Sequence, residues 1–497
     1  MAQKLVGNSA IPQEITAIVE TLEKAGFQAY LVGGCARDLF LGRTPKDWDI
    51  TTNAKPEAIQ TLFPKTVYEN VYGTVAVINE TTEDPRLRNV EVTPYRLESG
   101  YSDRRHPDSV IFSEKIEDDL QRRDFTVNAI ALSLSDGAIK DIIDLYGGFT
   151  DIKDRTIRTV GKPHDRFSED ALRMMRAIRF AVELDFTIEK DTLNAIKTLS
   201  NSIREVSIER IRDEFVKIVL SPDPKQGIEL LQEVGILKHF IPELEKSIGV
   251  TQNQAHAFTV WEHLLRSLQH AADENWDLDI RLSALFHDIA KPETRRVSRA
   301  TKQPTFYGHE VIGSRETRKI LERLKFSRVT IEKVTKMVRW HMFFSDTGMI
   351  TLSAVRRMIV NVGKENIWDL MNLRICDRIG TGRPKADPYR LRKYKSMVEE
   401  ALRDPISVTM LAIDGKRIME ISQISPGPKI GLVLNALMEE VLEEPKLNTA
   451  EYLEKRTLDL LALPDKTLVE LAEKGKEKKG EAEEKDLEII RKRHHVS

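Results

Sequence analysis

Cysteines, long apolar runs and net charge are all scarce in this chain of 497 residues. Its two cysteines, Cys35 and Cys376, are too few for a disulfide framework and favour a reducing compartment. No apolar run approaches the roughly 20 residues that a membrane-spanning helix needs, and the N-terminal segment lacks an apolar export sequence. The net charge of −2 excludes a generally basic chain, so any nucleic-acid surface must be local. We therefore expect a cytoplasmic protein without a membrane partner.

The composition indicates folded domains, more than one in number. Hydrophobic residues make up 41% of the chain and charged residues 31%, which is enough apolar material for buried cores. Strand-like and helix-like segments alternate in the first part, and helical periodicity dominates afterwards. The sequence predicts a multidomain α+β protein with an N-terminal α/β head and all-α domains after it. The expected boundaries are 1–152 for the head, 153–250 for a helical neck, 255–385 for a histidine-bearing helical domain, 400–467 for a C-terminal helical piece and 468–497 for a charged, flexible tail.

Two aspartates follow a glycine turn in the stretch YLVGGCARDLFLGRTPKDWDITTNA, residues 30–54. A strand is expected to end at the glycine pair, a short helix to follow, and DWDI to begin a second strand. Asp47 and Asp49 would then share one face, because side chains alternate along a strand. Paired carboxylates beside phosphate oxygens are usual ligands of Mg²⁺. Because D-x-D alone is a short motif, a surface turn with two solvated aspartates is the alternative.

The same turn carries groups suited to a phosphate. Gly33 and Gly34 offer backbone N–H groups and have no Cβ to keep an anion away. Arg37 would add a charge-assisted hydrogen bond to the same anion. The turn therefore predicts a site that holds both a phosphate and a metal ion.

Further polar candidates lie on later segments of the head. In DDLQRRDFTVNAIA, Arg123 could hold triphosphate oxygens, and Asp124 or Asn128 could accept a hydrogen bond from a ribose hydroxyl. Ordinary ion pairs at a helix N-terminus are the alternative there. On the expected strand NVEVT, Glu91 lies between two valines and faces away from their apolar side. Glu91 is either a third catalytic carboxylate or a solvated strand residue.

The segment SEDALRMMRAIRFAVEL, residues 168–184, predicts one helix with an informative beginning. Ser168 is expected to cap this helix, and the acidic residues beside it favour its positive end. Asp170, Arg173 and Arg176 recur every three residues and so stay near one side. A salt-bridged exposed face is one interpretation of this pattern.

Base recognition is the other interpretation. Cytosine and adenine both present an amino donor beside a ring-nitrogen acceptor, so Asp170 could accept from the amino group while Arg173 donates to the ring nitrogen. Guanine and uracil present a carbonyl and an N–H at those places, which would leave both contacts unpaired. Each buried polar group left unpaired costs roughly 1–3 kcal/mol. One carboxylate and one arginine could thus accept C and A and reject G and U without a nucleic-acid template.

Taken together, these motifs resemble a known family. LVGGCARD…PKDWDI, DLQRRDFTVNAIA, DLYGGFTDIKDRTIRTVG and FSEDALRMMRAIRFA occur in the order and spacing of the class II tRNA nucleotidyltransferases, the CCA-adding enzymes. That family shares a polymerase-β-like catalytic core with bacterial poly(A) polymerases. The resemblance covers about residues 28–245, and the segment 94–112 is similar to the family's flexible loop, which is linked to addition of the final A.

The resemblance implies a Mg²⁺-dependent enzyme that adds CCA to tRNA from CTP and ATP. It also implies a role for each matching position, and these roles divide between metal, phosphate, sugar and base. Asp47 and Asp49 match the metal-binding carboxylates, Gly34, Arg37 and Arg123 the triphosphate contacts, Asp124 the ribose contact, Asp170 and Arg173 the amino-acid template, and Arg176 a further nucleotide contact.

Four of the eleven histidines form a second constellation. The adjacent pair His287 and Asp288 is expected inside an apolar helix, LSALFHDIAKP, where a carboxylate without a partner or metal is too costly to bury. Imidazole and carboxylate groups from separate helices suit one or two first-row divalent ions or Mg²⁺, and two ions would form a clamp for phosphoester hydrolysis. The order H…HD…H…H…D resembles the HD phosphohydrolase domain over about 255–385. The expected ligands are His263, His287, Asp288, His309, His341 and Asp377.

Two alternatives to CCA addition stay open at this point. An enzyme of the same fold could add only A, either as a partner of a CC-adding enzyme or as a poly(A) polymerase. A protein of another class would be an HD phosphohydrolase whose N-terminal unit only binds RNA. Nucleotide addition by the head would distinguish the second alternative from both transferases.

Overall fold

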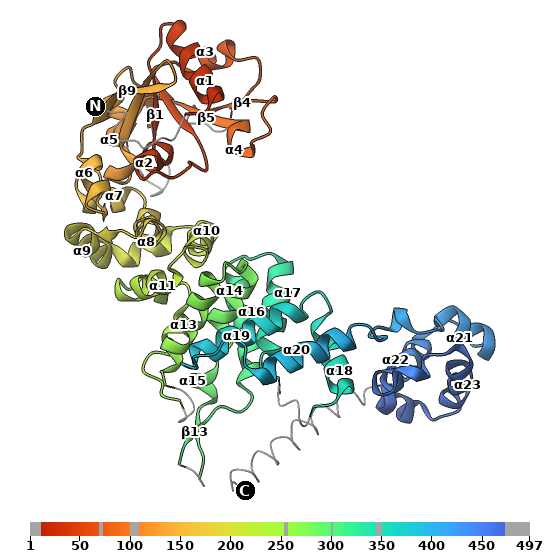
Figure 1. The fold of residues 1–497 in the computed structure, drawn as a ribbon. Helices are drawn as coiled ribbons and strands as arrows, with labels where there is room; N and C mark the ends of the chain where they lie inside the picture. The colour runs from red at the N-terminus through yellow and green to blue at the C-terminus, as the bar shows by residue number, and fades with distance from the viewer. Residues whose placement is uncertain are drawn as a thin grey trace. The chain divides into compact units, whose positions relative to one another are not determined.

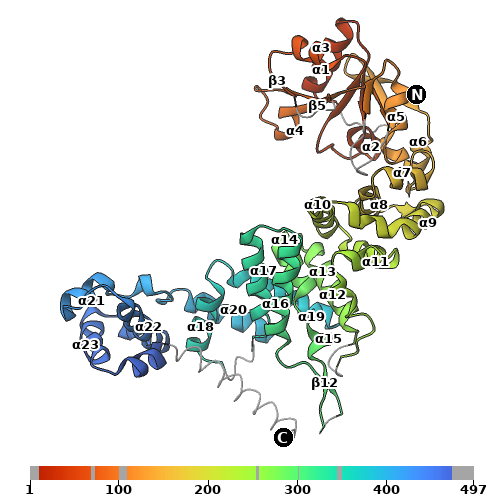
Figure 2. The same cartoon turned by 180° about the vertical axis from the view of Figure 1, so that it is seen from behind.

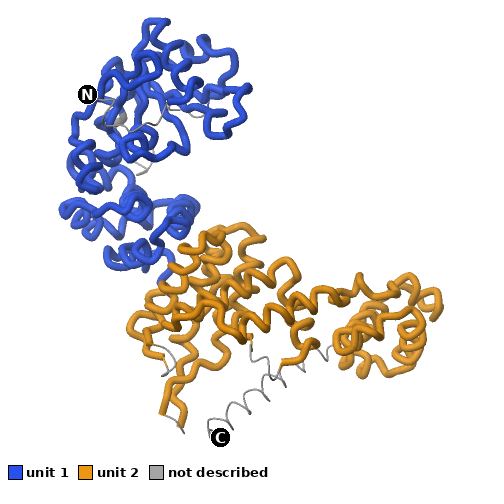
Figure 3. Tube along the Cα trace, viewed as in Figure 1, with its two compact units in different colours: residues 1–242 blue, residues 243–497 orange. Residues whose placement is uncertain are grey.

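A computed structural model describes most of the chain as two compact units, Met1–Pro242 and Glu243–Ser497, which are coloured separately in Figure 3. The division falls inside the predicted neck, and the finer domain boundaries stay predictions. Within the described ranges, no helix combines the length and the apolar character that crossing a bilayer requires. The described residues are 11–68, 73–99, 109–252, 257–299, 302–343 and 350–472.

The head contains a mixed sheet of seven strands in the order β3-β4-β5-β2-β1-β8-β9 (Figure 1). β2 pairs with β5 in parallel, whereas β1 pairs with both β2 and β8 in antiparallel fashion. This arrangement places the start of β2 next to the end of β1. The strands are β1 (Ala29–Val32), β2 (Asp49–Thr52), β3 (Thr66–Tyr68), β4 (Val75–Ile78), β5 (Asn89–Pro94), β8 (Ile130–Ser135) and β9 (Ala138–Asp144).

Short helices connect these strands and pack on the sheet. α2 begins at the glycine pair, directly after β1, as the sequence predicted. β6 (Arg96–Ser99) and β7 (Ser109–Phe112) pair as a separate hairpin, and the remainder of the predicted flexible loop, residues 100–108, lies outside the described residues. The helices of the head are α1 (Gln13–Lys24), α2 (Gly34–Phe40), α3 (Pro56–Leu62), α4 (Pro85–Arg88), α5 (Ile116–Gln121), η2 (Thr126–Asn128) and α6 (Gly148–Lys153).

The strand that carries the aspartates is shorter than expected. β2 begins at Asp49, and Asp47 lies in a bend before it, so the prediction that the two share a strand face is wrong. Pro45 lies two residues before Asp47 and has no N–H to donate to a sheet ladder. The backbone therefore joins the sheet only after the first aspartate.

The neck that follows the head is mostly helical. The predicted single helix over 168–184 is instead two helices, because Asp170 adopts an extended conformation between α7 and α8. Ser168 lies inside α7 and caps nothing, whereas Oδ1 of Asp170 accepts a hydrogen bond from the N–H of Leu172 at 3.0 Å. The neck contains α7 (Pro163–Glu169), α8 (Leu172–Leu184), α9 (Lys190–Leu199), η3 (Ser200–Glu205), α10 (Ile208–Val219), α11 (Pro224–Glu233), η4 (Leu237–His239), and the parallel pair β10 (Thr156–Ile157) and β11 (Thr187–Ile188).

The described part of the second unit is a helical bundle with a small hairpin, β12 (Arg296–Val297) and β13 (Pro304–Thr305). α13 packs against α14 and α19, and α16 packs against α17 (Figure 2). α13 begins with a capping box between Thr259 and Glu262, which fixes its first turn. The helices are α12 (Pro242–Glu245), α13 (Val260–Asp273), α14 (Leu278–Phe286), α15 (Lys291–Thr294), α16 (His309–Arg323), α17 (Arg328–Trp340), α18 (Leu352–Val362), α19 (Ile367–Gly380) and α20 (Tyr389–Ala401).

The C-terminal helices share a hydrophobic core with this bundle. One buried cluster extends from Ala271 on α13 through α18 and α20 to Leu468. Leu468 belongs to the start of the predicted tail, yet it is fully buried in a helical segment, and residues 473–497 lie outside the described residues. The last elements are η5 (Val408–Met410), α21 (Gly415–Ser422), α22 (Pro428–Glu443), η6 (Pro445–Leu447) and α23 (Ala450–Leu461).

Candidate functional site

Gly33, Asp49 and Arg123 meet at the beginning of β2. A Cβ added to Gly33 would lie 3.1 Å from Oδ2 of Asp49 and 3.2 Å from Nη1 of Arg123. Gly33 also has a φ of 80°, in the left-handed region that L side chains rarely adopt. A glycine is therefore needed here both for the turn and for the space between a carboxylate and a guanidinium group. The structure brings together three residues that the sequence assigned to one site.

Asp47 joins the same site although it lies outside the strand. A Cβ on Gly34 would lie 3.9 Å from Oδ1 of Asp47 and 3.8 Å from Nη2 of Arg37. Burial raises the pKa of Asp49 to about 6, with Arg123 opposing this rise and Asp47 adding to it. A carboxylate such as Asp49, whose pKa is raised by burial and by a neighbouring carboxylate, is stabilised in its ionised form by a nearby cation.

Glu91 lies beside Asp49 on the neighbouring strand. The two residues are paired in the parallel register of β2 and β5, and paired residues of adjacent strands point to the same face. Glu91 is exposed, so its carboxylate borders the face that carries Asp49. This position fits both sequence interpretations, a third catalytic carboxylate and a solvated strand residue.

A chain of hydrogen bonds connects Arg37 with the neck. Nη1 of Arg37 donates to Oδ1 of Asn128 at 2.8 Å, and Nδ2 of Asn128 donates to Oδ1 of Asp124 at 3.4 Å. Nε of Arg176 on α8 donates to Oδ2 of Asp124 at 2.7 Å. Burial alone would raise the pKa of Asp124, but Arg176 and Arg173 outweigh it and hold the pKa at about 2. Asp124 is therefore an ionised acceptor that links head and neck.

Arg123 is oriented by an acid that the sequence analysis did not single out. Its Nη2 donates to Oδ2 of Asp119 at 3.0 Å, and Nη2 of Arg122 donates to Oδ1 of the same carboxylate at 2.6 Å. Asp119 is fully buried on α5. The spacing of three and four residues between this aspartate and the two arginines could have indicated the contact, because such residues are neighbours on a helix.

The two predicted base-reading residues have partners within the neck. Nη2 of Arg210 on α10 donates to Oδ2 of Asp170 at 2.7 Å, and Nη1 donates to Oδ1 at 3.3 Å. Arg173 forms an ion pair with Glu169 and also donates to the backbone carbonyl of Arg122. Sequence reasoning missed Arg210, because nothing in the local pattern joins two residues 40 positions apart. Both template candidates are thus oriented by ion pairs before any nucleotide binds.

A Gly33→Ala variant tests the geometry of this turn. A methyl group there would contact Asp49 and Arg123, and a displacement of reacting groups by about 1 Å can cost roughly 100-fold in rate. We expect nucleotide addition to fall by about that factor. Gly26→Ala is the matched control, because Gly26 has a φ of 89° and no atom within 4 Å of an added Cβ. Equal losses of activity in both variants, measured as initial rates, would show that backbone strain alone is responsible.

The second constellation assembles in the helical bundle of the second unit. The adjacent His287 and Asp288 are buried as predicted, but they follow the end of α14 at Phe286 and do not lie inside the helix. The chain turns there, so the two side chains can point to the same centre, which adjacent positions on a helix cannot do. The other expected ligands also come from separate elements. His263 lies on α13, His309 at the start of α16, His341 directly after α17, and Asp377 on α19.

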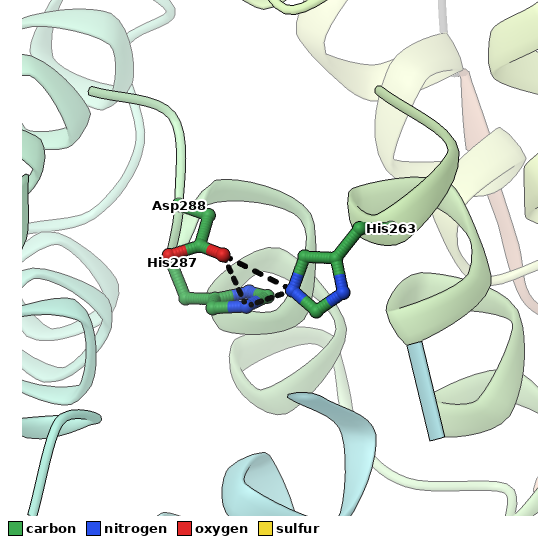
Figure 4. A group of neighbouring side chains, drawn as sticks. All are labelled: His263, His287 and Asp288. Atoms are coloured by element: carbon green, nitrogen blue, oxygen red, sulfur yellow. Dashed lines mark hydrogen bonds and ion pairs between the residues drawn. The ribbon is translucent and has the colours of Figure 1, made fainter. Parts of the chain in front are cut away.

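Asp288 lies between two groups of histidines. Its Oδ2 is 3.1 Å from Nε2 of His263 and 3.4 Å from Nε2 of His287, as drawn in Figure 4. Its Oδ1 is 3.2 Å from Nε2 of His309 and 3.5 Å from Nε2 of His341. Each group of three has a geometry that could hold a metal ion. The structure therefore places one carboxylate between two adjacent candidate metal positions.

Asp377 completes the first of these groups. Its Oδ1 lies 3.5 Å from Nε2 of His263 and 3.9 Å from Nε2 of His287. Burial would raise the pKa of this carboxyl, but Arg374 and the histidines outweigh burial and lower it. Arg374 also forms an ion pair with the other oxygen of Asp377. All six residues that the sequence assigned to the HD site thus converge.

Backbone carbonyls orient three of the imidazole rings. Nδ1 of His287, His309 and His341 lies 2.9, 2.6 and 2.7 Å from the carbonyl oxygens three residues earlier in the chain. Donation by Nδ1–H leaves the Nε2 lone pair directed at the centre, which is the usual arrangement of a metal-binding histidine. Burial lowers the pKa of His287 to about 3, so this ring is neutral at pH 7. These features fit metal ligands better than ordinary core histidines.

Lys291 is a further polar residue at this site that the sequence analysis did not name. Its Nζ lies 2.5 Å from Oδ2 of Asp288 and donates to the side chain of Gln252 at 2.7 Å. Burial would raise the pKa of Asp288, but Lys291 and His287 outweigh burial and hold it well below its usual range. A lysine three residues after an aspartate could have indicated this ion pair.

Comparison with known families divides the chain into three matching regions. Residues 29–158 match the poly A polymerase head domain, and residues 185–248 match a probable RNA- and SrmB-binding site of polymerase A. Residues 260–369 match the HD domain. The first region contains the glycine turn with Asp47 and Asp49, and the third contains five of the six residues of the histidine cluster.

Similar proteins cover nearly the whole chain. A CCA-adding enzyme of Lactobacillus helveticus is 32% identical over 447 residues, which is 89% of this chain and 96% of that protein. One from Ligilactobacillus salivarius is 46% identical over 233 residues, 46% of this chain and 55% of that protein. The crystal structure of the Bacillus stearothermophilus CCA-adding enzyme in complex with CTP is 27% identical, with a TM-score of 0.66 over 90% of this chain and 96% of that one.

Proposed function

The chain belongs to the CCA-adding enzyme family, and from this premise we propose that it adds CCA to tRNA 3′ ends from CTP and ATP without a nucleic-acid template. The observation that carries the proposal is the meeting of Gly33, Asp49 and Arg123 in a chain that aligns with a CCA-adding enzyme over 96% of that protein's length. A structure of a 27% identical relative in complex with CTP supports CTP as one of the substrates. The reaction releases pyrophosphate.

Each group at the turn has a chemical task in this proposal. Asp47 and Asp49 form an oxygen-only donor set that fits Mg²⁺, which when bound favours ionisation of the RNA 3′-hydroxyl and neutralises charge on the leaving pyrophosphate. The backbone N–H groups at Gly33 and Gly34, with Arg37 and Arg123, hold the triphosphate. None of these contacts depends on the base.

The base is selected by the neck. Asp170 accepts a hydrogen bond from the amino group of cytosine or adenine, and Arg173 donates to the neighbouring ring nitrogen. A carboxylate has about four acceptor positions, so Asp170 can keep its contact with Arg210 while it binds a base. In this proposal Asp124 and Asn128 bind the ribose, and Arg176, which donates a hydrogen bond to Asp124, makes a further nucleotide contact. Guanine and uracil leave the Asp170 and Arg173 contacts unpaired.

Single-nucleotide extension tests this proposal. A tRNA transcript that ends at the discriminator base is incubated with CTP alone, ATP alone, or both, and product lengths are measured by mass spectrometry. We expect two additions with CTP alone and three with both nucleotides. Addition of ATP to a tRNA that ends in CC, with no addition of CTP to the discriminator base, would instead establish an A-adding enzyme.

A second candidate function is metal-dependent hydrolysis of phosphoesters by the HD site. The position of Asp288 between two groups of histidines favours it. Imidazole and carboxylate donors fit first-row transition ions, and a pair of ions would polarise a phosphoester and supply a metal-bound nucleophile when present. Lys291 would orient Asp288.

Metal content gives a prediction for the HD site. We expect the purified chain to bind first-row divalent ions in chelator-treated buffer, and Asp288→Asn to lose both positions, because both groups share this carboxylate. The variant His309→Gln should lose only one of the two metal positions. Stoichiometry measured by inductively coupled plasma mass spectrometry decides this, and CCA addition should be unchanged in both variants. An unaltered metal content in Asp288→Asn would contradict the assignment.

A further inference from the structure

A basic hairpin interrupts the helices of the HD domain. The segment RRVSRATKQPTFY, residues 295–307, contains four cationic side chains and no acidic residue. Its residues 296–297 and 304–305 form the pair β12 and β13, which is visible at the edge of the bundle in Figure 2. The exposed cations are Arg295, Arg296, Arg299 and Lys302.

The cations of this hairpin have no carboxylate partner among the described residues. Arg295 donates to the hydroxyl of Thr251, and Arg296 donates to the backbone carbonyls of Glu293 and Arg295. Other exposed arginines of this unit differ, since Arg318 and Arg328 each form an ion pair with a glutamate four residues later. Exposed cations without acidic partners are available for phosphate groups.

Both ends of the hairpin are built into the HD site. The hairpin lies between Asp288 and His309 in the chain, and the carbonyl oxygen of Phe306 lies 2.6 Å from Nδ1 of His309. On the other side, Nζ of Lys291 lies 2.5 Å from Oδ2 of Asp288 and 5.5 Å from the centre of the Phe306 ring. The base of the hairpin therefore lies next to the HD site.

An exposed aromatic ring lies at the base of the hairpin. Tyr307 is 58% exposed, two residues before His309. Stacking of one nucleic-acid base on an aromatic side chain contributes roughly 1–3 kcal/mol. Cationic side chains combined with an exposed aromatic ring are typical of surfaces that bind single strands.

We propose that the hairpin binds the end of a single-stranded RNA and presents its terminal phosphate monoester to the HD site. This inference rests on the hydrolytic function proposed for that site. In the reaction, water adds to phosphorus, the ester P–O bond breaks, and the released ribose oxygen takes up a proton. The hairpin contacts the phosphates of the strand and Tyr307 stacks on a base, so a strand end is bound more tightly than a small phosphoester.

Hydrolysis assays with matched substrates test the proposal. Two six-nucleotide RNAs, one with a 3′-terminal and one with a 5′-terminal phosphate, are compared with the small monoester p-nitrophenyl phosphate. For whichever RNA is hydrolysed, we expect Arg296→Gln/Arg299→Gln to raise KM by roughly 10-fold and to reduce the logarithmic salt dependence by about 1.4, the value for two phosphate contacts. Hydrolysis of the small ester should change less than twofold, and so should CCA addition. The control variant Arg318→Gln/Arg328→Gln removes the same charge, and it should change the hydrolysis of neither substrate.

Cross-linking provides a second readout that does not require hydrolysis. An RNA with 4-thiouridine at its end is irradiated with the full-length chain, and the modified peptides are identified by mass spectrometry. We expect a cross-link at Tyr307 that is lost in Arg296→Gln/Arg299→Gln. Absence of this cross-link overturns the hairpin proposal. The proposal is also overturned if Arg296→Gln/Arg299→Gln reduces hydrolysis of RNA and of the small ester equally. Failure of the wild-type chain to hydrolyse any of the substrates overturns the HD function, whereas a cross-link at Tyr307 would still support the hairpin as an RNA surface.

Discussion

Replacement of Asp49 by asparagine is expected to abolish nucleotide addition, with a loss of at least about 1,000-fold, comparable to removal of a central group that stabilises charge in the transition state. The change removes a negative charge while it keeps the size of the side chain. Asp49 is the residue at which the turn, the strand and Arg123 meet, and asparagine can neither attract a divalent cation strongly nor balance the guanidinium group. Single-turnover rates of CTP addition to tRNA give the measurement.

Stability measurements separate lost chemistry from lost folding. Because burial raises the pKa of Asp49 to about 6, above that of an unfolded aspartate, its contribution to stability is complete below about pH 4 and is lost as the pH rises through 6. Without divalent ions, Asp49→Asn should therefore unfold at an equal or higher temperature than the wild type at pH 8. A marked fall in the unfolding temperature there would attribute the inactivity to misfolding.

Replacement of Asp170 by alanine is expected to weaken the choice of base. The wild type should reject UTP and GTP because two contacts would be left unpaired, at roughly 1–3 kcal/mol each. Without the carboxylate, CTP and ATP each lose one hydrogen bond, and we expect their kcat/KM to fall roughly 10- to 100-fold. UTP and GTP should change less, because they never formed that contact. The ratio of kcat/KM values for CTP and UTP on the same tRNA is the measurement.

The control for this variant lies on α10. Asp213 is an exposed carboxylate that pairs with its neighbour Arg212, three residues from Arg210. Asp213→Ala removes the same charge from the neck at a residue that does not contact Asp170. The ratio of its kcat/KM values for CTP and UTP should equal that of the wild type. If both variants leave the ratio unchanged, base choice resides elsewhere.

The elements that were predictable from the sequence are those with short, local signals. The glycine turn and the buried His-Asp pair depend on residue types and spacing within a few residues. The meeting of Gly33 with Arg123 also followed from the sequence, through the order of the motifs rather than through any local pattern.

Errors and omissions arose where the chain leaves regular structure or where distant charges pair. Pro45 delays the start of β2, so alternation did not apply to Asp47. Asp170 interrupts the predicted helix, because its carboxylate accepts from the backbone N–H of Leu172. The ion pair between Arg210 and Asp170 joins two helices, and no periodicity of a single helix can predict it.

The HD site was also predictable only in part from the sequence. The adjacent His287 and Asp288 were readable because they lie in an apolar stretch where a polar residue needs a partner, and the other ligands followed from their order along the chain. The central position of Asp288 could not be predicted from the sequence. Its two carboxylate oxygens face different histidines because α14 ends at Phe286, directly before the His-Asp pair. Three-dimensional placement, not residue type, determines which ligand is shared.

Structures of the chain with CTP and with ATP would show whether one carboxylate and one arginine select both bases. We expect the amino group of each base to lie within hydrogen-bonding distance of the Asp170 carboxylate and the adjacent ring nitrogen to accept from Arg173. The triphosphate should lie at Gly34 and Arg37. A base edge that meets other residues in either complex, with Asp170 bound only to Arg210, would contradict this expectation.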